Sequence, residues 1–495
     1  MRAEASLPEA GGWLGERLMD RVVRWALLLV AVLVAVAWAA LVVLAKGGDR
    51  WVWGGATAAL VLLGLLAAWQ PMWAIYGCLL LRAVSLNYLY GWRDPMDGFY
   101  APVEASQLKA FGQLISMDSM QASFLLVVAC IVLFLQSRPL LALKKMVLPF
   151  GAFLALMGLS WVLGGGELYG VKTAASVVTP ILFGAAVYAV VAPQRDSSAF
   201  ERLLYYSVAF SVAVGIVAQL LGGKPLLALH GDMLRFCGGT APPGFCMVVF
   251  PALALAYSRA LRQDWRAWLL VTGLLFLIGT TLTRAHLWVA MVVLVVGALL
   301  APRRKLRTAL VGVLASLVVV WMFWDPLQRR TFGPGKLPGY LVRFFVEEDV
   351  LERVGLTAWR EVDTSGRRAL WRDYWRLARQ RPLCGYGPGS AQVLLEKPGW
   401  TRQVVPHNEY LRLVIETGVP GALVYFGALF YLLAILWRRR RAQGLGALWV
   451  DAAVLCLGIL LLLAVSENVL YVQGFPSAVL AVAAVALKST DAHAP

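Results

Sequence analysis

Apolar runs separated by short polar turns fill most of this 495-residue chain. A helix needs about 20 apolar residues to cross the hydrocarbon core of a membrane, and about fourteen runs approach that length. They lie at roughly 22–45, 51–68, 72–89, 121–137, 147–163, 177–193, 203–222, 243–260, 266–282, 285–301, 309–324, 419–437, 446–466 and 471–488. The pattern predicts an all-α polytopic membrane protein with about 12 to 14 transmembrane helices, because helices satisfy their own backbone hydrogen bonds in lipid.

Residues 325–418 interrupt this pattern with Trp, Arg, Gly and Pro in place of aliphatic side chains. A loop of that length inside a compact protein is usually functional. We therefore expect three parts. They are about eleven transmembrane helices over 1–324, a large loop with amphipathic helices over 325–418, and about three more transmembrane helices with a short tail over 419–495.

Composition and charge support this class and orient the chain. Hydrophobic residues make up 60% and charged residues 15%, which excludes an ordinary soluble domain. The basic clusters at 303–307 and 438–441 are expected in the cytoplasm, because short cytoplasmic loops are rich in Lys and Arg. Successive spans cross the membrane in opposite directions. Counting from these two cytoplasmic clusters therefore places both termini in the cytoplasm and residues 325–418 outside. The net charge of +17 then indicates contact with anionic lipid headgroups rather than nucleic acid.

Metal and cofactor chemistry has little support in the sequence. No two His or carboxylate residues lie at metal-ligand spacing and no CxxC motif occurs, so we expect no metal and no cofactor. Cys237 and Cys246 are either a disulfide on the outer side or two buried thiols. Of the four histidines, His230, His286 and His407 are expected at the outer face.

His407 has the most informative surroundings, because it precedes the pattern of a helix start in PHNEYLRLVIETGVPG. Asn408 is a typical N-cap residue and Glu409 falls in the first turn. Gly418 with Pro420 then marks the helix end. The positive end of such a helix favours an uncharged imidazole, which is a free base at neutral pH, and it also attracts phosphate. The alternative is that His407 only continues the turn.

Arg284 lies between two apolar runs in GTTLTRAHLW, where an arginine at mid-membrane depth costs roughly 2.5–3.5 kcal/mol. Such a charge needs a partner, and the neighbouring threonines are suited to line a polar pocket. The alternative is a simple hairpin from which Arg284 reaches the lipid headgroups. Arg82, inside the third apolar run, raises the same question.

Residues 367–381 predict an amphipathic helix with a basic row opposite an apolar stripe. The row contains Arg368, Arg372, Arg376 and Arg379, and the stripe contains Trp371, Tyr374, Trp375 and Ala378. Such a helix suits a membrane surface, with aromatic rings in the interface and guanidinium groups on phosphates. The alternative is a solvated charged face. Arg367 lies outside the basic row, so this pattern predicts a different direction for its side chain.

The segment CGYGPGS follows this helix directly. Its glycines at 385, 387 and 389 predict a flexible turn. No strand-turn-helix unit surrounds them, so they do not indicate a nucleotide-binding loop.

Four motifs, taken in order along the chain, resemble the signature of the O-antigen ligase and O-antigen polymerase superfamily. They are TLTRAHLW, SGRRALW, RPLCGYGPGS and PHNEYLRLVIETGVPG, and the resemblance covers roughly residues 275–440. It implies a multispan (GT-C type) glycosyltransferase of the bacterial inner membrane that faces the periplasm and needs no metal. It also implies transfer of a glycan from undecaprenyl diphosphate onto a sugar hydroxyl, with inversion of the anomeric centre.

Through the same resemblance, the family's essential arginines fall on Arg284 and Arg367 and its essential histidine falls on His407. Thr283 stands where the family usually has Ser, which keeps a hydroxyl at that position. Arg284 and Arg367 are then expected to clamp the donor diphosphate, and His407 to take the proton from the acceptor hydroxyl. Arg235, in HGDMLRFCGG, is a further candidate for the phosphate site.

Three functions are considered for this chain, and they differ in whether a glycan is transferred and to which acceptor. A ligase uses lipid A-core, which is phosphorylated and membrane-anchored, and Arg368, Arg372 and Arg376 are suited to bind it. This favours an O-antigen ligase in lipopolysaccharide biosynthesis. One alternative is an O-antigen or exopolysaccharide polymerase, whose acceptor is a second lipid-linked glycan. The other is a transporter or flippase for lipid-linked sugars, which predicts polar residues spread over several helices near the midplane rather than gathered in one loop.

Overall fold

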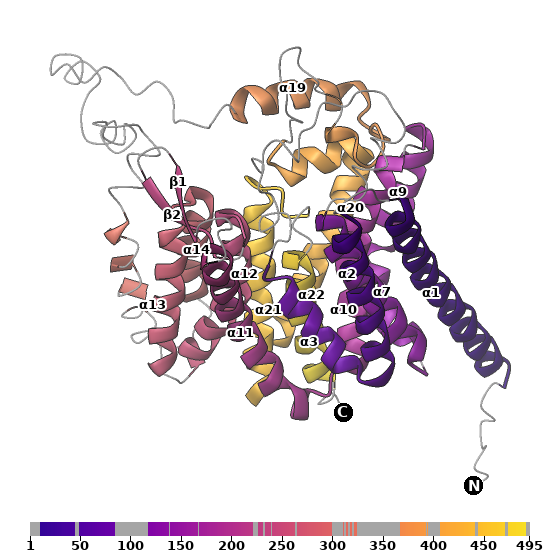
Figure 1. The fold of residues 1–495 in the computed structure, drawn as a ribbon, viewed down its shortest axis with the longest axis horizontal. Coiled ribbons are helices and arrows are strands. Elements are labelled where there is room, and N and C mark those ends of the chain that lie inside the picture. The colour runs from indigo at the N-terminus through magenta and orange to yellow at the C-terminus, as the bar shows by residue number, and fades with distance from the viewer. Residues whose placement is uncertain are drawn as a thin grey trace, which may run out of the picture.

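The structure, a computed structural model, describes the chain in segments separated by gaps. The segments are residues 10–44, 49–84, 117–137, 139–166, 168–220, 226–230, 233–238, 240–262, 265–298, 367–392, 394, 406–440, 444–470 and 474–491, with scattered positions between 310 and 323. Most of these residues are helical and form one bundle, with a two-stranded hairpin at its edge (Figure 1).

Five of the described helices are long and apolar enough to cross a membrane. They are α10 (Leu168–Val190), α11 (Pro193–Leu220), α12 (Pro242–Arg262), α20 (Glu409–Arg439) and α21 (Gly444–Leu463). A sixth candidate is bent by 49° and consists of α8 (Pro139–Met146), η1 (Leu148–Phe150) and α9 (Gly151–Leu163). The prediction of a helical membrane protein is confirmed, whereas the larger number of about fourteen spans stays a prediction.

The other helices are α1 (Ala10–Leu44), α2 (Asp49–Trp69), α3 (Pro71–Leu81), α7 (Met117–Leu135), α13 (Trp265–Thr280), α14 (Arg284–Ala298) and α22 (Gly474–Asp491). Every predicted apolar run overlaps a described helix except 309–324, which lies largely outside the described residues. Residues 325–366 and 395–405 lie outside them as well, so the predicted division into three parts stays a prediction. The run at 72–89 predicts a longer helix than α3, which ends at Leu81.

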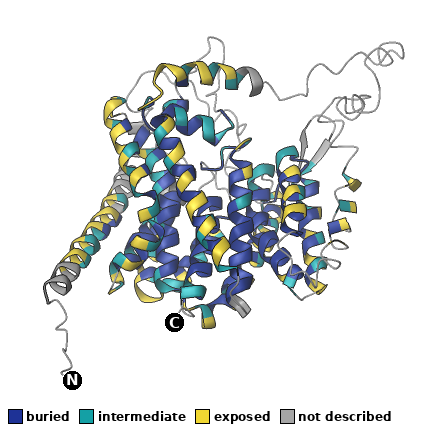
Figure 2. Ribbon diagram, turned by 180° about the vertical axis from the view of Figure 1, so that it is seen from behind, coloured by how far each residue is buried: buried dark blue, intermediate teal, exposed yellow. Residues whose placement is uncertain are grey.

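The centre of the bundle is formed by α10, α12, α21 and α22. Of these, α12, α21 and α22 are almost wholly buried, and α10 is largely buried (Figure 2). Most of α22 consists of Ala, Val and Leu, and nearly all of its side chains are buried. Small side chains let neighbouring helices approach closely in a membrane, where dispersion contacts rather than the hydrophobic effect hold them together.

Ion pairs join the helices at the end of the bundle where the chain terminates, here called the C-terminal end (Figure 1). Asp491 on α22 accepts a hydrogen bond of 2.6 Å from Arg439 and lies 3.2 Å from Lys145 Nζ. Asp451 on α21 lies 2.7 Å from Arg262 Nη2. Each carboxylate therefore neutralises a basic residue from another helix.

The opposite end of the bundle, here called the α19 end, carries α19 (Arg367–Gln380), which lies across the start of α20 (Figure 1). The sequence predicts a helix end at Gly418 and Pro420, but α20 continues through a kink there, with φ 74° at Gly418. A side chain at position 418 would collide with the Leu383 backbone, so only Gly fits. The kink sets off residues 409–417, here called the short arm of α20.

Candidate functional site

His407 lies at the α19 end, directly before the short arm of α20. The predicted N-cap is confirmed, because Asn408 Oδ1 accepts a hydrogen bond of 2.9 Å from the Leu411 backbone N–H. The His407 ring is half-buried, and its Nδ1 lies 3.2 Å from Asn468 Nδ2. His407 also has φ 48°, which is unusual for a residue other than Gly and indicates a position fixed by its surroundings.

The connection after α21 holds this start of α20 in place. Glu409 N–H donates to Ala464 O at 2.7 Å, and Leu470 N–H donates to Glu409 Oε1 at 2.9 Å. Residues 464–470 therefore bond to the first turn of α20 on both sides of Asn468. This arrangement brings Asn468 to His407, a contact between residues far apart in the sequence.

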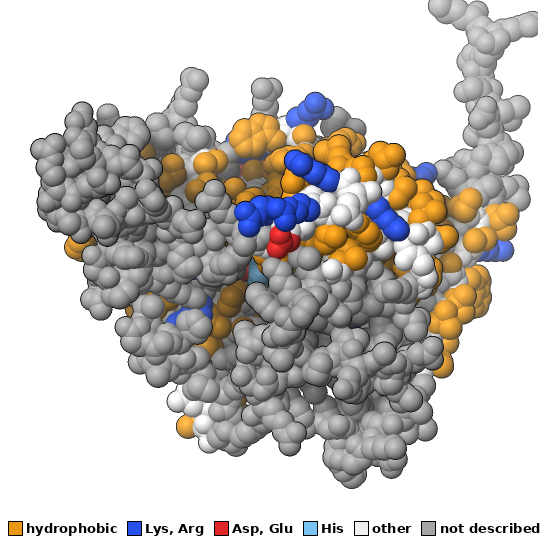
Figure 3. Space-filling view, turned by 90° about the horizontal axis from the view of Figure 1, so that it is seen from above, with side chains coloured by type: hydrophobic (Ala, Val, Ile, Leu, Met, Phe, Trp, Pro, Cys, Tyr) orange, Lys and Arg blue, Asp and Glu red, His pale blue; other side chains and the backbone are white. Residues whose placement is uncertain are grey.

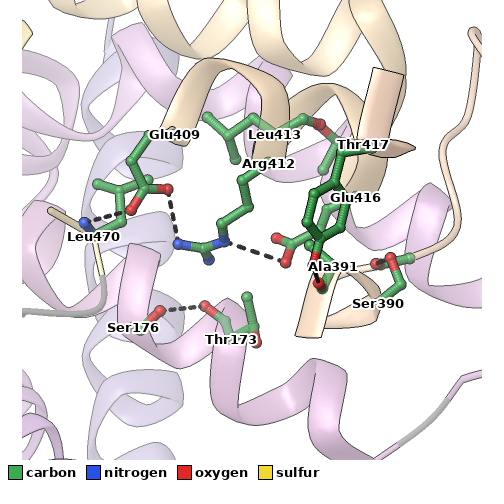
Figure 4. Close-up of polar contacts among 12 residues, drawn as sticks. Thr173, Ser176, Ser390, Ala391, Glu409, Arg412, Leu413, Glu416, Thr417 and Leu470 are labelled. Carbon is green, nitrogen blue, oxygen red and sulfur yellow. Dashed lines mark hydrogen bonds and ion pairs between the residues drawn. The ribbon is translucent and has the colours of Figure 1, made fainter. Parts of the chain in front are cut away.

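A buried charged group lies one turn beyond His407 (Figure 4). Arg412 Nη1 lies 2.8 Å from Glu409 Oε2, and Arg412 Nε lies 3.2 Å from Glu416 Oε1. The three side chains are at most 2% exposed. Glu416 also accepts hydrogen bonds from the backbone of Gly389 and Ala391, so hydrogen bonds as well as ion pairs hold this buried group in place.

Arg412 and Glu416 are not among the site residues predicted from the sequence, although a signal was present. Residues spaced i, i+3 and i+7 share one face of a helix, and Glu409, Arg412 and Glu416 have that spacing. Oppositely charged residues on one helical face, within an otherwise apolar segment, favour an internal ion pair.

The second half of the site is the turn between α13 and α14. A hairpin of β1 (Leu227–His230) and β2 (Met233–Phe236) brings Arg235 to this turn. Arg235 Nε donates to Thr281 O at 2.9 Å, and its Nη2 donates to Thr283 Oγ1 at 3.1 Å. Arg284 follows as the first residue of α14 and is half-buried. The structure thus brings together two of the arginines that the sequence singles out.

The threonines of this turn hold its backbone rather than facing an open pocket. Thr281 and Thr283 are buried and hydrogen-bond to each other at 3.1 Å. Leu282 between them has φ 49°. Among the residues that the structure describes, Leu282 and His407 are the non-glycine residues with positive φ, and both flank the proposed chemistry.

Cys246 on α12 connects the two halves. Its Sγ lies 3.1 Å from Thr281 Oγ1, and it is within electrostatic range of Arg235 and Glu467. Glu467 precedes Asn468 in the connection that reaches His407. The turn between α13 and α14 and the turn at His407 therefore border the same region. Cys246 and Cys237 are separate buried thiols, so the disulfide alternative is wrong.

The apolar stripe of α19 contacts protein. Tyr374 is fully buried, its hydroxyl donates to Ala391 O at 2.5 Å, and burial with a smaller effect of Glu416 raises its pKa. Trp371 Nε1 donates to Pro406 O at 2.5 Å, directly beside His407. The prediction that the Tyr374 ring lies in the membrane interface is wrong, because this ring packs against Ile415 on the short arm of α20. For Trp371, which is half-buried, it stays a prediction. Trp375 is exposed.

The basic row of α19 faces outward. Arg372, Arg376 and Arg379 are exposed, and basic side chains lie over this face among apolar ones (Figure 3). Arg367 is the first residue of α19, but its side chain and that of Arg368 lie outside the described residues. Their predicted roles stay predictions.

The glycine turn after α19 is anchored, so the prediction of a flexible turn is wrong. Gly385, Gly387 and Gly389 all have positive φ, and a Cβ at Gly385 would lie 2.5 Å from Ile415 O. Tyr386 N–H donates to Ile415 O at 2.8 Å. Ser160 Oγ on α9 donates to Cys384 O in the turn and to Glu416 O in the short arm, both at 2.5 Å. The turn therefore joins α9 to the short arm.

The other two histidines expected at the outer face are less informative. His286 is fully buried and stacks on Phe250 at 5.9 Å between ring centroids, and the side chain of His230 lies outside the described residues. In the part of the chain that the structure describes, no three His, Cys, Asp or Glu side chains gather to hold a metal ion.

Comparison with known proteins agrees with the four motifs. Residues 268–426 match the family model described as O-Antigen ligase, a range that contains Arg284, Arg367 and His407. Arg235 and Asn468 lie outside it. A comparison with curated proteins gives no match. The matched family supports a ligase-type or polymerase-type glycosyltransferase activity. The predicted resemblance to the O-antigen ligase superfamily is therefore confirmed, because residues 268–426 match the model of that family.

Proposed function

We propose that this chain is an inverting glycosyltransferase of the O-antigen ligase type. It moves a glycan from undecaprenyl diphosphate onto a sugar hydroxyl of lipid A-core in lipopolysaccharide biosynthesis, without a metal or cofactor. The observation that carries the proposal is the placement of His407, which contacts Asn468 at 3.2 Å within an O-antigen ligase domain. An imidazole held in this way is suited to act as a general base.

The chemistry needs a base and a phosphate site but no nucleophilic side chain, because the donor already carries a diphosphate leaving group. The acceptor oxygen forms a bond to the anomeric carbon while its proton moves to His407. The bond between that carbon and the phosphate oxygen breaks, and its electrons go to the diphosphate. One direct displacement of this kind inverts the anomeric centre.

Asn468 is proposed to select the nitrogen of His407 that acts as base. Its amide faces His407 Nδ1, and the amide oxygen and nitrogen exchange places by a half-turn. With the oxygen toward the ring, Nδ1–H donates to Asn468 and Nε2 accepts the proton. We propose this orientation of the amide, with Nε2 as the base and Asn468 as a positioning residue.

Arg284, Arg235 and Arg367 are the proposed phosphate ligands. Support for the first two comes from the 281–284 turn, because Thr281 and Thr283 orient the Arg235 guanidinium beside the residue that starts α14. A guanidinium presents paired N–H donors that match phosphate oxygens. Arg367 is proposed from the motif it occupies at the start of α19.

The acceptor is proposed to bind along α19. Arg372 and Arg376 are exposed there, Arg368 has the same spacing, and Trp375 adds an exposed ring. Lipid A-core offers phosphates and a membrane-anchored sugar to such a surface. The α19 end then faces the periplasm, and both termini of a protein with about fourteen spans lie in the cytoplasm of a bacterial inner membrane.

A reconstituted transfer reaction tests this function. Purified protein in liposomes receives undecaprenyl-diphosphate-linked O-antigen together with lipid A-core, and we expect O-antigen attached to the core. A polymerase would instead join two lipid-linked glycans and leave the core unmodified. A transporter would move the lipid-linked glycan across the bilayer without forming a bond. Either result would contradict the ligase assignment.

A further inference from the structure

Arg82 is a charged side chain that the transfer reaction described above does not use. It follows α3 and is 6% exposed. Because α3 has 11 residues, it is about 16 Å long, roughly half the thickness of the ~30 Å hydrocarbon core. The chain thus places a guanidinium inside the bundle, where arginine is rare and marks a functional site more often than elsewhere.

The Arg82 guanidinium has unmet hydrogen-bonding capacity. Its Nε and Nη2 atoms are buried and have no hydrogen-bond partner among the residues that the structure describes. The last carbonyls of α3, those of Cys78 and Leu80, accept instead from the backbone N–H of Arg82. The negative end of the helix makes the charge more tolerable, but it leaves these side-chain donors unsatisfied.

The unmet donors form one edge of the guanidinium. Nε–H and the neighbouring Nη2–H point in the same direction, and this edge is the one that binds two oxygens of a phosphate or carboxylate side by side. Within the described part of the chain, the titratable group that acts on Arg82 is the Cys456 thiol on α21, a weak partner. A bidentate anion would satisfy both donors at once.

Arg82 lies beside the connection that holds His407. Residues 464–470 of that connection carry Asn468, and Gly474 begins α22 shortly afterwards. A Cβ added at Gly474 would lie 2.8 Å from the Arg82 Cβ, so glycine at the start of α22 leaves room for the arginine. His407 and Arg82 therefore contact two parts of the same link between α21 and α22.

We propose that Arg82 binds a phosphate of the polyprenyl diphosphate carrier through its Nε–Nη2 edge. This inference rests on the proposed function, because it takes the donor to be a lipid-linked diphosphate. The carrier's apolar tail lies among helices, so its phosphates are the part that meets a cation placed inside the bundle. An arginine that binds the ligand is uncompensated in the ligand-free protein, whereas a structural arginine has its partner already.

The test uses purified full-length protein in nanodiscs and measures melting temperature against undecaprenyl diphosphate concentration. The variants are Arg82→Gln, Arg82→Lys and the control Arg202→Gln, which removes an exposed arginine on α11. A ligand that binds the folded state raises its melting temperature. We expect wild type and Arg202→Gln to respond equally, Arg82→Gln to bind at least tenfold more weakly, and Arg82→Lys to lie between them. Without ligand, Arg82→Gln should melt at or above the wild-type temperature, because it loses a buried charge that no described residue neutralises.

Three results would overturn the proposal. Wild-type affinity in Arg82→Gln would remove Arg82 from the carrier site, and a lower melting temperature without ligand would make its role structural. An equal, Arg82-dependent response to phosphatidylglycerol would assign the bound anion to a membrane phospholipid. If wild type itself does not respond to undecaprenyl diphosphate, the proposed donor class fails first and the inference falls with it.

Discussion

The two ends of the helix bundle place arginine in opposite surroundings. At the C-terminal end, Arg439 meets Asp491 at 2.6 Å, and the pair joins α20 to α22. Inside the bundle, Arg82 is buried with two donors unmet among the described residues, and at the α19 end Arg235 donates to the oxygens of Thr281 and Thr283. An arginine paired with a carboxylate holds helices together, whereas one without an anion is suited to receive it from a ligand. We therefore use the local charge balance to separate structural arginines from those proposed to bind the ligand.

Arg412 shows that this distinction depends on partners and not on which end an arginine occupies. It lies at the α19 end, yet it bonds to Glu409 and Glu416 and is fully buried. Its position on the short arm connects the start of α20 to the glycine turn below α19. We assign it to the structure that positions His407 rather than to the reaction.

Replacing His407 with alanine should give the largest change in activity at the α19 end. General-base catalysis contributes roughly 100- to 10,000-fold, so transfer should fall by about that factor while the protein still inserts and folds. Rates of O-antigen transfer with purified protein measure the effect, and His493→Ala in the tail is the matched control. Wild-type rates from His407→Ala would remove it as the base.

Arg412→Met should give the largest loss of stability. It leaves Glu409 and Glu416 buried without their cation, and breaking a buried pair in this way costs about 3–5 kcal/mol. Thermal unfolding in detergent measures the loss. Adding Glu409→Gln and Glu416→Gln to the same chain removes the uncompensated anions and should recover part of it. Unchanged melting of the single variant would contradict the structural role of Arg412.

Arg235→Lys should weaken donor binding while keeping the positive charge. A lysine loses the planar guanidinium that bonds Thr281 and Thr283 and that is proposed to bind phosphate. Hydrogen bonds to charged groups contribute about 1.5–3 kcal/mol, which corresponds to roughly 10- to 100-fold in affinity. The KM for the lipid-linked donor reports this change, and Arg367→Lys tests the other proposed ligand in the same assay. An unaltered KM in Arg235→Lys would place Arg235 outside the phosphate site.

Arg439→Gln should give the smallest effect. The Arg439 and Asp491 side chains are 28% and 23% exposed, and a partly solvated ion pair contributes about 1 kcal/mol or less. Transfer activity should equal that of wild type, with a slightly lower melting temperature. A loss of transfer at constant stability would break the comparison, because it would give a paired arginine at the C-terminal end a role in the reaction.

Apolar length and short motifs were sufficient to predict the helices and part of the site. Runs of about 20 apolar residues mark membrane helices, and the N-cap at Asn408 follows from local residue preferences. The family motifs placed Arg284 and His407 within one domain. These features depend on residues close together in the sequence, so they can be predicted without the three-dimensional structure.

Features that depend on distant residues were not predictable. Asn468 reaches His407 only because the 464–470 connection bonds to Glu409, and no local pattern indicates that contact. The glycine turn resembles a flexible loop until its contact with Ile415 is known. Similarly, an amphipathic pattern does not specify whether Tyr374 packs on lipid or on protein.

The central claim is that the α19 end transfers a glycan by direct displacement, with His407 as base. Its most direct test is the product of one reaction, in which purified protein acts on labelled undecaprenyl-diphosphate-linked O-antigen and lipid A-core. We predict that attached glycan and released undecaprenyl diphosphate appear in equal amounts, that the anomeric configuration is inverted, and that His407→Ala yields neither product. Retained configuration, or product formation by His407→Ala at the wild-type rate, would contradict this mechanism.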